Sequence, residues 1–224
     1  MNTAVIVAAG RGKRMGGEVD KLFLNVSGLP VVGHTWRRFD AAPDIDEVVL
    51  VVRKGTEEGF NALADSLSLA KPWRLALGGT ERQDSVWHGV EASSAESELI
   101  AIQDGARPCT SQEIIAATLT AARETGAAVA ARKVTDTLKE EDDGVIARTV
   151  DRARLWAVQT PQVFQRQVIV RALREVRDRG LHVTDDTAAC ELIGQQVRLV
   201  ADEAANPKVT MPGDLEYIAS LLAG

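Results

Sequence analysis

A glycine-rich segment near the N-terminus, residues 8–16, combines side chains that suit phosphate binding. Its glycines let backbone N–H groups approach a phosphate closely, because no Cβ intrudes. Arg11, Lys13, Arg14 and Lys21 lie in it or just after it with only two acidic residues among them, although the net charge of the chain is −6. Like charges crowded on a short loop repel each other unless an anion binds there. The segment therefore predicts a triphosphate site, with a solvated basic loop as the alternative.

Two other glycine-rich motifs are excluded by individual residues. A dinucleotide-binding fingerprint needs glycine at its first, third and sixth positions, but Met15 occupies the sixth. It also needs an acidic residue at the end of the second strand, where Arg53 and Lys54 stand. A Walker A loop ends in Gly-Lys-Ser/Thr, and the chain contains no such sequence. These absences argue against a nicotinamide-dependent oxidoreductase and against a P-loop NTPase.

Two further segments carry residues that suit a nucleotide site. Gly78 and Gly79 are expected to form a turn that opens a helix, and their small size would let a base or a ribose lie against the backbone. Asp104 and Gly105 follow directly after an apolar run that predicts a buried strand. A carboxylate in that place suits Mg²⁺, which prefers oxygen ligands shared between protein and phosphate. A helix cap or a loop-ordering acid is the alternative.

The elements that must position these residues alternate between strand and helix over the first 130 residues. Apolar β-branched runs predict strands, and helical periodicity predicts the segments between them. Strands joined by long helices pair in parallel through right-handed crossovers, and ligands bind such sheets at the carboxyl ends of the strands. We expect an α/β fold with a doubly wound, mostly parallel sheet in a single domain of residues 1–224. Strands are expected at 4–8, 47–52, 74–77, 99–102 and 127–130, and helices at 30–42, 56–69, 81–93 and 111–125.

The alternation breaks after about residue 130. Asp142-Asp143-Gly144 lies between the runs 134–138 and 145–150, and an Asp-Gly pair in such a place predicts a β-hairpin. The insertion, at about 132–155, is expected to be an arm that packs on a second subunit, or else a plain surface hairpin. Helices at 166–179 and 185–193, a strand at 197–200 and a helix from about Pro212 complete the chain.

The composition limits the function classes. A net charge of −6 argues against a general nucleic-acid-binding protein, which needs a basic surface. Cys109 and Cys190 lack the spacing of a metal site or a disulfide framework and are expected to be buried and reduced. No apolar stretch approaches the roughly 20 residues of a membrane span, and no leader precedes the first strand, so we expect a cytoplasmic protein without a membrane partner. The three histidines form no catalytic grouping.

A collinear set of segments runs through nearly the whole chain: residues 8–15 with Lys21, then 78–86, 104–108, 136–137, 149–152, 159–162, 184–186 and 208–210. This set resembles the 2-C-methyl-D-erythritol 4-phosphate cytidylyltransferases. The glycine-rich segment alone matches only the broader Rossmann-like nucleotidyltransferase fold, whereas the later segments are far more specific.

The resemblance implies an enzyme that joins CTP to 2-C-methyl-D-erythritol 4-phosphate, with Mg²⁺ as cofactor and a homodimer formed through the arm. Arg14 and Lys21 would neutralise the charge that develops on the α-phosphate in the transition state. Asp104 would assist a Mg²⁺ ion held mostly by substrate phosphates. The nucleotide would contact Ala8, Ala9, Gly10, Gly12, Gly78, Gly79, Ser85, Asp104, Gly105 and Lys208. The acceptor would contact Thr137, Arg152, Thr160, Thr184 and Lys208, the first two across the dimer interface.

Two positions depart from the family pattern. Gly105 stands where alanine is common, which is a small change. Ala205 stands where an acid is common, which leaves an expected polar contact near Lys208 in doubt. Two alternatives stay open: the same CTP chemistry on another polyol phosphate such as ribitol 5-phosphate, and a nucleotide sensor without catalysis. Retention of Arg14 and Lys21, together with the arm, argues against the sensor.

Overall fold

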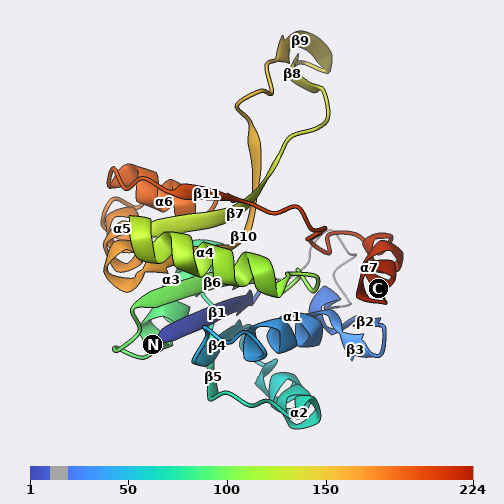
Figure 1. Cartoon of the computed structure of the whole chain (residues 1–224), viewed down its shortest axis with the longest axis vertical. Coiled ribbons are helices and arrows are strands. Elements are labelled where there is room, and N and C mark those ends of the chain that lie inside the picture. Colours follow the sequence, from blue (N-terminus) through green and yellow to red (C-terminus); the bar gives the residue numbers. More distant parts are fainter. Residues whose placement is uncertain (11–19, 224) are drawn as a thin grey trace.

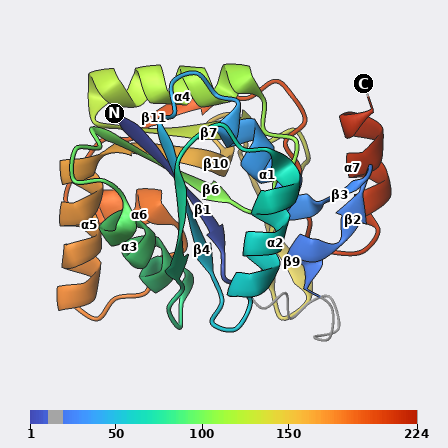
Figure 2. The same cartoon turned by 90° about the horizontal axis from the view of Figure 1, so that it is seen from below.

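The computed structural model describes residues 1–10 and 20–223, and its centre is a seven-stranded sheet with helices on both faces (Figures 1 and 2). The strands are β1 (Asn2–Ala8), β4 (Glu47–Val52), β5 (Trp73–Leu77), β6 (Leu99–Asp104), β7 (Ala127–Lys133), β10 (Trp156–Gln165) and β11 (Arg198–Ala201). Their order is β11-β7-β10-β6-β1-β4-β5. β1 pairs in parallel with β4 and β6, β4 with β5, and β7 with β11. The expected fold, a doubly wound and mostly parallel sheet, is confirmed.

β10 is a central strand that the sequence does not predict. It lies between β6 and β7 and is antiparallel to both. Its register against β7 shifts between Val158 and Gln162, across Pro161. Proline is unusual in a central strand because it cannot donate a ladder hydrogen bond, so this stretch does not resemble one. Beyond the shift, Val163 and Phe164 are fully buried, and their packing holds the second half of β10 in the sheet.

The sheet separates the hydrophobic core into two parts, and helices cover each part from outside. The helices are α1 (Val31–Asp40), α2 (Glu57–Leu67), α3 (Arg82–Ala92), α4 (Gln112–Thr125), α5 (Arg166–Asp178), α6 (Asp186–Leu192) and α7 (Asp214–Leu222). Successive side chains of a strand point to opposite faces. Ala4 and Ile6 of β1 therefore pack with α1, α2 and α4, whereas Val5 packs with α3 and α5. Figure 2 shows these helices on the two faces of the sheet. The aliphatic runs of the sequence become strands covered on both sides.

The arm projects from the body between β7 and β10 (Figure 1). Its strands β8 (Leu138–Asp142) and β9 (Val145–Val150) form a separate two-stranded antiparallel sheet. Asp143 and Gly144 have φ angles of 49° and 77°, the left-handed pair that a tight hairpin turn requires. The predicted turn is therefore confirmed, but the first strand covers 138–142 rather than 134–138.

Residues 21–30, near the N-terminus, lie beside the C-terminal helix α7. The 3₁₀ helix η2 (Lys21–Phe23) leads into a short hairpin of β2 (Asn25–Val26) and β3 (Leu29–Pro30), none of which the sequence predicts. α7 lies beside this hairpin and contacts β2 (Figures 1 and 2). The predicted C-terminal helix is thus present, and it packs next to residues close to the N-terminal glycine-rich segment.

Two expectations drawn from composition can be compared with the structure. Cys109 and Cys190 are both buried and form no disulfide, as expected. Within residues 1–10 and 20–223, no helix combines the length and the apolar character that crossing a bilayer would require.

α3 approaches the sheet closely at Gly89. A Cβ at this position would lie 2.4 Å from Val5 Cγ1 and 2.7 Å from Val51 Cγ2. We expect Gly89→Ala to lower the free energy of unfolding by about 1–3 kcal/mol in urea denaturation, because the packed core must shift to make room. Gly33→Ala in α1 is the matched control, since its Cβ would come no nearer than 3.4 Å to Leu63. Equal losses in both variants would contradict the close approach.

Candidate active site

A cleft of about 760 Å³ opens at the carboxyl edge of the sheet, next to the ends of β1 and β6 and the start of α3. It brings together segments that are distant in sequence, as expected for a doubly wound sheet. Most of the residues expected at the nucleotide line it: Ala9, Gly10, Gly78, Gly79, Ser85, Asp104, Gly105 and Lys208, together with Lys21. Ala8 is buried at the end of β1 and does not line the cleft. Gly12 and Arg14 lie outside the described residues.

The turn before α3 needs its glycines for packing. A Cβ on Gly78 would lie 2.3 Å from the Cβ of Ala9, and one on Gly79 would lie 2.3 Å from the Cβ of Asp84. The Gly79 N–H donates to Ser85 Oγ at 3.1 Å, which closes the turn. The two glycines therefore let the first turn of α3 lie against the end of β1, and they add no side chains to this wall of the cleft.

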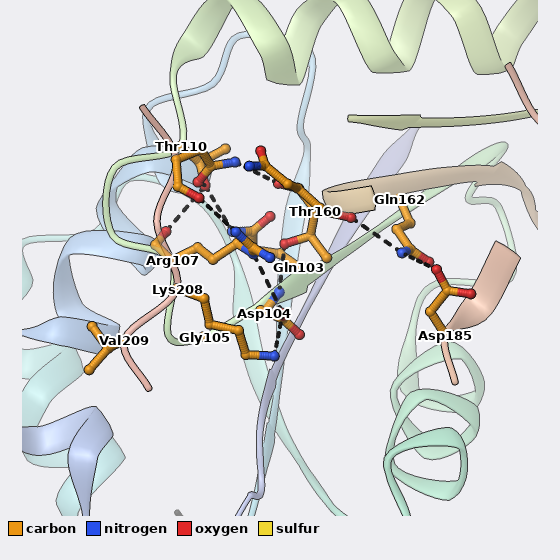
Figure 3. Close-up of polar contacts among 12 residues, drawn as sticks. Gln103, Asp104, Gly105, Arg107, Thr110, Thr160, Gln162, Asp185, Lys208 and Val209 are labelled. Carbon is orange, nitrogen blue, oxygen red and sulfur yellow. Dashed lines mark hydrogen bonds and ion pairs between the residues drawn. The ribbon is translucent and has the colours of Figure 1, made fainter. Parts of the chain in front are cut away.

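Asp104, the last residue of β6, is the acid around which the cations of the cleft gather (Figure 3). Lys208 Nζ donates to Asp104 Oδ2 at 2.7 Å, and the Nε atoms of Arg82 and Arg107 lie 3.7 Å and 3.6 Å from its carboxylate oxygens. Burial alone would raise the pKa of Asp104, but Lys208, Arg82 and Arg107 outweigh burial and hold this pKa below its usual value. Lys208 thus has an acidic partner although residue 205 is alanine.

Arg82, the first residue of α3, joins Asp104 to a second acid. Its Nη2 lies 2.8 Å from Oδ2 of Asp186, whose side chain is fully buried at the start of α6. Burial by itself would lower the pKa of Arg82, but Asp186 and Asp104 outweigh burial and raise that pKa. Arg82 therefore stays charged and connects the segment 78–86 with the segment 184–186.

Asn206 holds the chain that carries Lys208 against the loop after β6 and against β10. Its side-chain oxygen accepts from Thr110 Oγ1 at 3.1 Å, and its amide nitrogen donates to the Thr160 carbonyl at 2.9 Å. Its own carbonyl accepts from Arg107 Nη1 at 2.6 Å. Since Asn206 is 2% exposed, these bonds are shielded from water, and they fix the path of the chain just before Lys208.

Lys21 reaches the cleft from η2. Its Nζ donates to the main-chain carbonyl of Val209 at 2.8 Å, one residue beyond Lys208. Asp20 caps η2 and also pairs with Arg53 at 3.1 Å. Lys208 belongs to the same short stretch of C-terminal chain as Val209, and Lys21 is bonded to it, so the stretch positions both of these cations in the cleft.

Comparison with known proteins places the chain among enzymes. A model of the family described as 2-C-methyl-D-erythritol 4-phosphate cytidylyltransferase matches residues 2–223. The chain belongs to this family. Its relatives include the enzyme of that name from Pelotomaculum thermopropionicum, which is 42% identical over 221 residues covering 98% of this chain and 93% of the relative. The one from Bacillus cereus is 38% identical over 222 residues, covering 99% and 98%.

Solved structures of cytidylyltransferases share the fold over its whole length. The 4-diphosphocytidyl-2C-methyl-D-erythritol synthase of Anaerococcus prevotii has a TM-score of 0.87 at 30% identity and covers 100% of this chain and 99% of its own. The 2-C-methyl-D-erythritol 4-phosphate cytidylyltransferase of Thermus thermophilus has a TM-score of 0.82 at 32% identity, with 100% of both chains covered.

The residues expected at the acceptor of this cytidylyltransferase are divided between two places. Thr160 Oγ1 accepts from the Asp104 N–H at 3.1 Å, so Thr160 is buried behind Asp104 and does not itself line the cleft. Thr184 is exposed just before α6 and does not line the cleft. Thr137 and Arg152 are exposed next to the two strands of the arm and do not line the cleft of their own chain. A single chain therefore brings together most of the residues expected at the nucleotide but not those expected at the acceptor.

Sequence reasoning assigns no role to several residues that organise the cleft. Arg82 offered a signal, because a cation in the first turn of a helix is disfavoured by the helix dipole unless acids lie nearby. Asp186 and Asn206 offered none, since nothing in their neighbouring residues indicates that a carboxylate and an amide will be buried. Their partners come from other elements, and only the tertiary fold brings them together.

Asp104→Asn would leave Lys208, Arg82 and Arg107 without their shared counter-ion. We expect the free energy of unfolding at pH 7 to fall by about 3 kcal/mol, the lower end for a broken buried pair because Lys208 is partly exposed. The pKa of Asp104 is lower in the folded protein than in the unfolded chain, where it is about 4. The stabilisation by the Asp104 carboxylate is therefore present above the unfolded pKa and is lost as pH falls through the folded pKa. The difference in the free energy of unfolding between wild type and variant, measured with urea, should therefore shrink below about pH 4. A difference independent of pH would contradict this assignment.

Proposed function

We propose that this chain transfers the cytidylyl group of CTP to 2-C-methyl-D-erythritol 4-phosphate, giving 4-diphosphocytidyl-2-C-methyl-D-erythritol and pyrophosphate. The observation that carries the proposal is the cleft at the carboxyl edge of the sheet, where Lys21 and Lys208 converge beside a glycine turn. Membership of the cytidylyltransferase family supports the same two substrates.

The reaction is an in-line displacement at the α-phosphorus of CTP. A phosphate oxygen of the acceptor forms the new P–O bond while the bond from the α-phosphorus to the bridging oxygen breaks, and pyrophosphate leaves with that electron pair. A phosphate monoester has a second pKa of about 6, so the attacking oxygen is already ionised at pH 7 and needs no general base. Catalysis then depends on positioning and on neutralising charge.

The cations of the chain supply that neutralisation. Lys21 and Arg14 are assigned to the α-phosphate in the transition state, where preorganised donors act most strongly. The position of Lys21 in the cleft supports its assignment, whereas that of Arg14 rests on the family resemblance. Lys208 is assigned to both the nucleotide and the acceptor phosphate. Nucleotide contacts are assigned to Ala9, Gly10, Gly12, Gly78, Gly79, Ser85, Asp104 and Gly105, whereas Ala8, which does not line the cleft, is not among them.

Mg²⁺ is the proposed cofactor, and it would arrive with the nucleotide. Within residues 1–10 and 20–223, no group of three or more His, Cys, Asp or Glu side chains could hold a metal ion. Asp104 bonds Lys208 through Oδ2, and its Oδ1 lies 3.7 Å from Arg82 Nε, beyond hydrogen-bond distance, so Oδ1 can also accept a direct or water-mediated contact with the ion. This sparse donor set fits Mg²⁺, which keeps several waters and binds through one or two carboxylates plus substrate phosphates. When bound beside Asp104, the ion would supply electrostatic stabilisation of the charge on the leaving pyrophosphate.

A homodimer formed through the arm is proposed to complete the acceptor site. Val145 and Ile146 at the tip of the arm are 69% and 63% exposed, and a two-stranded hairpin is marginally stable alone in water. Both facts favour packing of the arm against another surface. In the proposed dimer, the arm of one copy brings Thr137 and Arg152 to the acceptor, where Thr160 and Thr184 of the other copy complete the pocket.

The function is tested by following pyrophosphate release with CTP and Mg²⁺ while two acceptors are offered in parallel. We expect turnover with 2-C-methyl-D-erythritol 4-phosphate and none above background with ribitol 5-phosphate. Turnover with ribitol 5-phosphate alone would keep the chemistry and overturn the acceptor. CTP binding without release from either acceptor would instead indicate a nucleotide sensor.

The arm assignment is tested with Arg152→Ala. We expect KM for the acceptor to rise about tenfold or more, because a charged hydrogen bond to phosphate is lost, while KM for CTP stays nearly constant. Arg148→Ala on the same arm is a control, since Arg148 pairs with Glu140 within the hairpin. Steady-state kinetics with each substrate varied in turn gives both constants. Equal effects of Arg152→Ala on both substrates would contradict its place in the acceptor half.

A further inference from the structure

Asp214 collects three hydrogen bonds at the start of the C-terminal helix. Its Oδ2 accepts from the N–H of Thr210 at 2.6 Å, from the hydroxyl of Thr210 at 2.9 Å and from the N–H of Met211 at 2.8 Å. The backbone bonds from Met211 and Thr210 hold the pKa of Asp214 below its ordinary value, and the charge of Lys21 lowers it further. The carboxylate therefore stays charged at neutral pH and closes a tight turn between Thr210 and α7.

The residue just before this turn holds Lys21. Val209 is fully buried, its N–H donates to the Ala106 carbonyl at 2.9 Å, and its own carbonyl accepts from Lys21 Nζ at 2.8 Å. The neighbouring Lys208 is bonded to Asp104 (Figure 3). Residues 208, 209 and 210 are thus each fixed by a different partner, and both of these lysines line the cleft.

Packing of α7 connects the same turn to the other end of the Lys21 contact. Ile218 is fully buried, and Leu215 and Ala219 pack against the core that also contains Leu22. α7 also contacts β2, which follows η2 in the chain (Figures 1 and 2). Both groups of the Lys21–Val209 hydrogen bond therefore belong to one packed unit, and the bonds of Asp214 join α7 to the segment that accepts from Lys21.

We propose that Asp214 is a positioning residue for cytidylyl transfer, because it closes the turn that places the Val209 carbonyl and through it the Lys21 ammonium. This inference rests on the proposed function, in which Lys21 acts on the α-phosphate. Asp214 itself does not line the cleft, so it acts through Lys21 rather than on a substrate. When the Asp214 carboxylate is removed, residue 209 keeps its hydrogen bond to the Ala106 carbonyl, but the turn that joins it to α7 is no longer closed. A displacement of about 1 Å at a charge-stabilising group is enough to slow a transfer reaction substantially.

The test compares Asp214→Ala with Glu216→Ala in the full chain. Glu216 is exposed in the same helical turn, so its removal takes away an equal charge without breaking the turn. We expect Asp214→Ala to lower kcat about tenfold or more while KM for CTP changes little, since the ground-state contacts with the nucleotide are kept. Glu216→Ala should leave both constants unchanged.

A second readout follows Lys21 itself. Acetic anhydride modifies lysine amines, and mass spectrometry gives the rate at Lys21 relative to that at the exposed Lys54. We expect this ratio to rise in Asp214→Ala, because the hydrogen bond from the ammonium to the Val209 carbonyl is weakened, and to stay constant in Glu216→Ala. A lower melting temperature with kcat and the Lys21 ratio unchanged would show a purely structural role and would overturn the inference.

Two further variants keep the outcome decisive. If Asp214→Ala does not fold, Thr210→Val removes only the hydroxyl donor, and it should change kcat and the Lys21 ratio in the same direction by less. Lys21→Ala separates this inference from the proposed function. Near-normal turnover of Lys21→Ala would remove Lys21 from catalysis, and the inference would fall with it. Lost turnover in Lys21→Ala together with normal kinetics in Asp214→Ala would overturn only the positioning role.

Discussion

The shape of the cleft depends on the charge of one buried carboxylate, that of Asp104. An anion at the end of a buried strand is costly unless cations lie against it. Lys208, Arg82 and Arg107 supply them from the C-terminal segment, from the start of α3 and from the loop after β6. Because these three cations lie against one carboxylate, the three segments that carry them meet at the same point. The position of this part of the cleft follows from their meeting there.

The same requirement extends beyond Asp104. Arg82, at the start of α3, also contacts the buried Asp186 at the start of α6, so the charge of Arg82 balances that of Asp186. On the other side, Asn206 bonds Thr160, whose hydroxyl accepts from the Asp104 N–H. A buried polar network is stable when its members are all satisfied and costly when one is missing. The segments that carry Asp104, Arg82 and Lys208 and those that carry Thr160 and Asp186 are therefore fixed relative to each other by hydrogen bonds and ion pairs, in addition to apolar packing.

These observations also show what a sequence can and cannot predict here. Residues 47–52 predict a buried strand from their own sequence, because an almost unbroken apolar and β-branched run indicates burial on both faces without reference to the rest of the chain. β10 could not be predicted, since Pro161 contradicts a central strand locally and only the packing of Val163 and Phe164 compensates. The Asp-Gly pair predicts the turn of the arm because turn geometry is local, whereas the extent of β8 depends on pairing with β9. The cations of the glycine-rich segment indicate a phosphate site, but the partners of Arg82 and Asn206 are long-range contacts with no local trace.

The division of the site between cleft and arm has a physical consequence for catalysis. A side chain can stabilise a transition state only when its own position is held by packing or by hydrogen bonds. Lys21 and Lys208 meet this condition within one chain, through the Val209 carbonyl and Asp104. Thr137 and Arg152 do not, because they lie exposed on an arm whose hairpin has no core of its own. In the proposed homodimer, burial of the arm supplies that missing constraint. Acceptor binding and subunit association would then stabilise each other, because anything that binds the assembled state favours assembly.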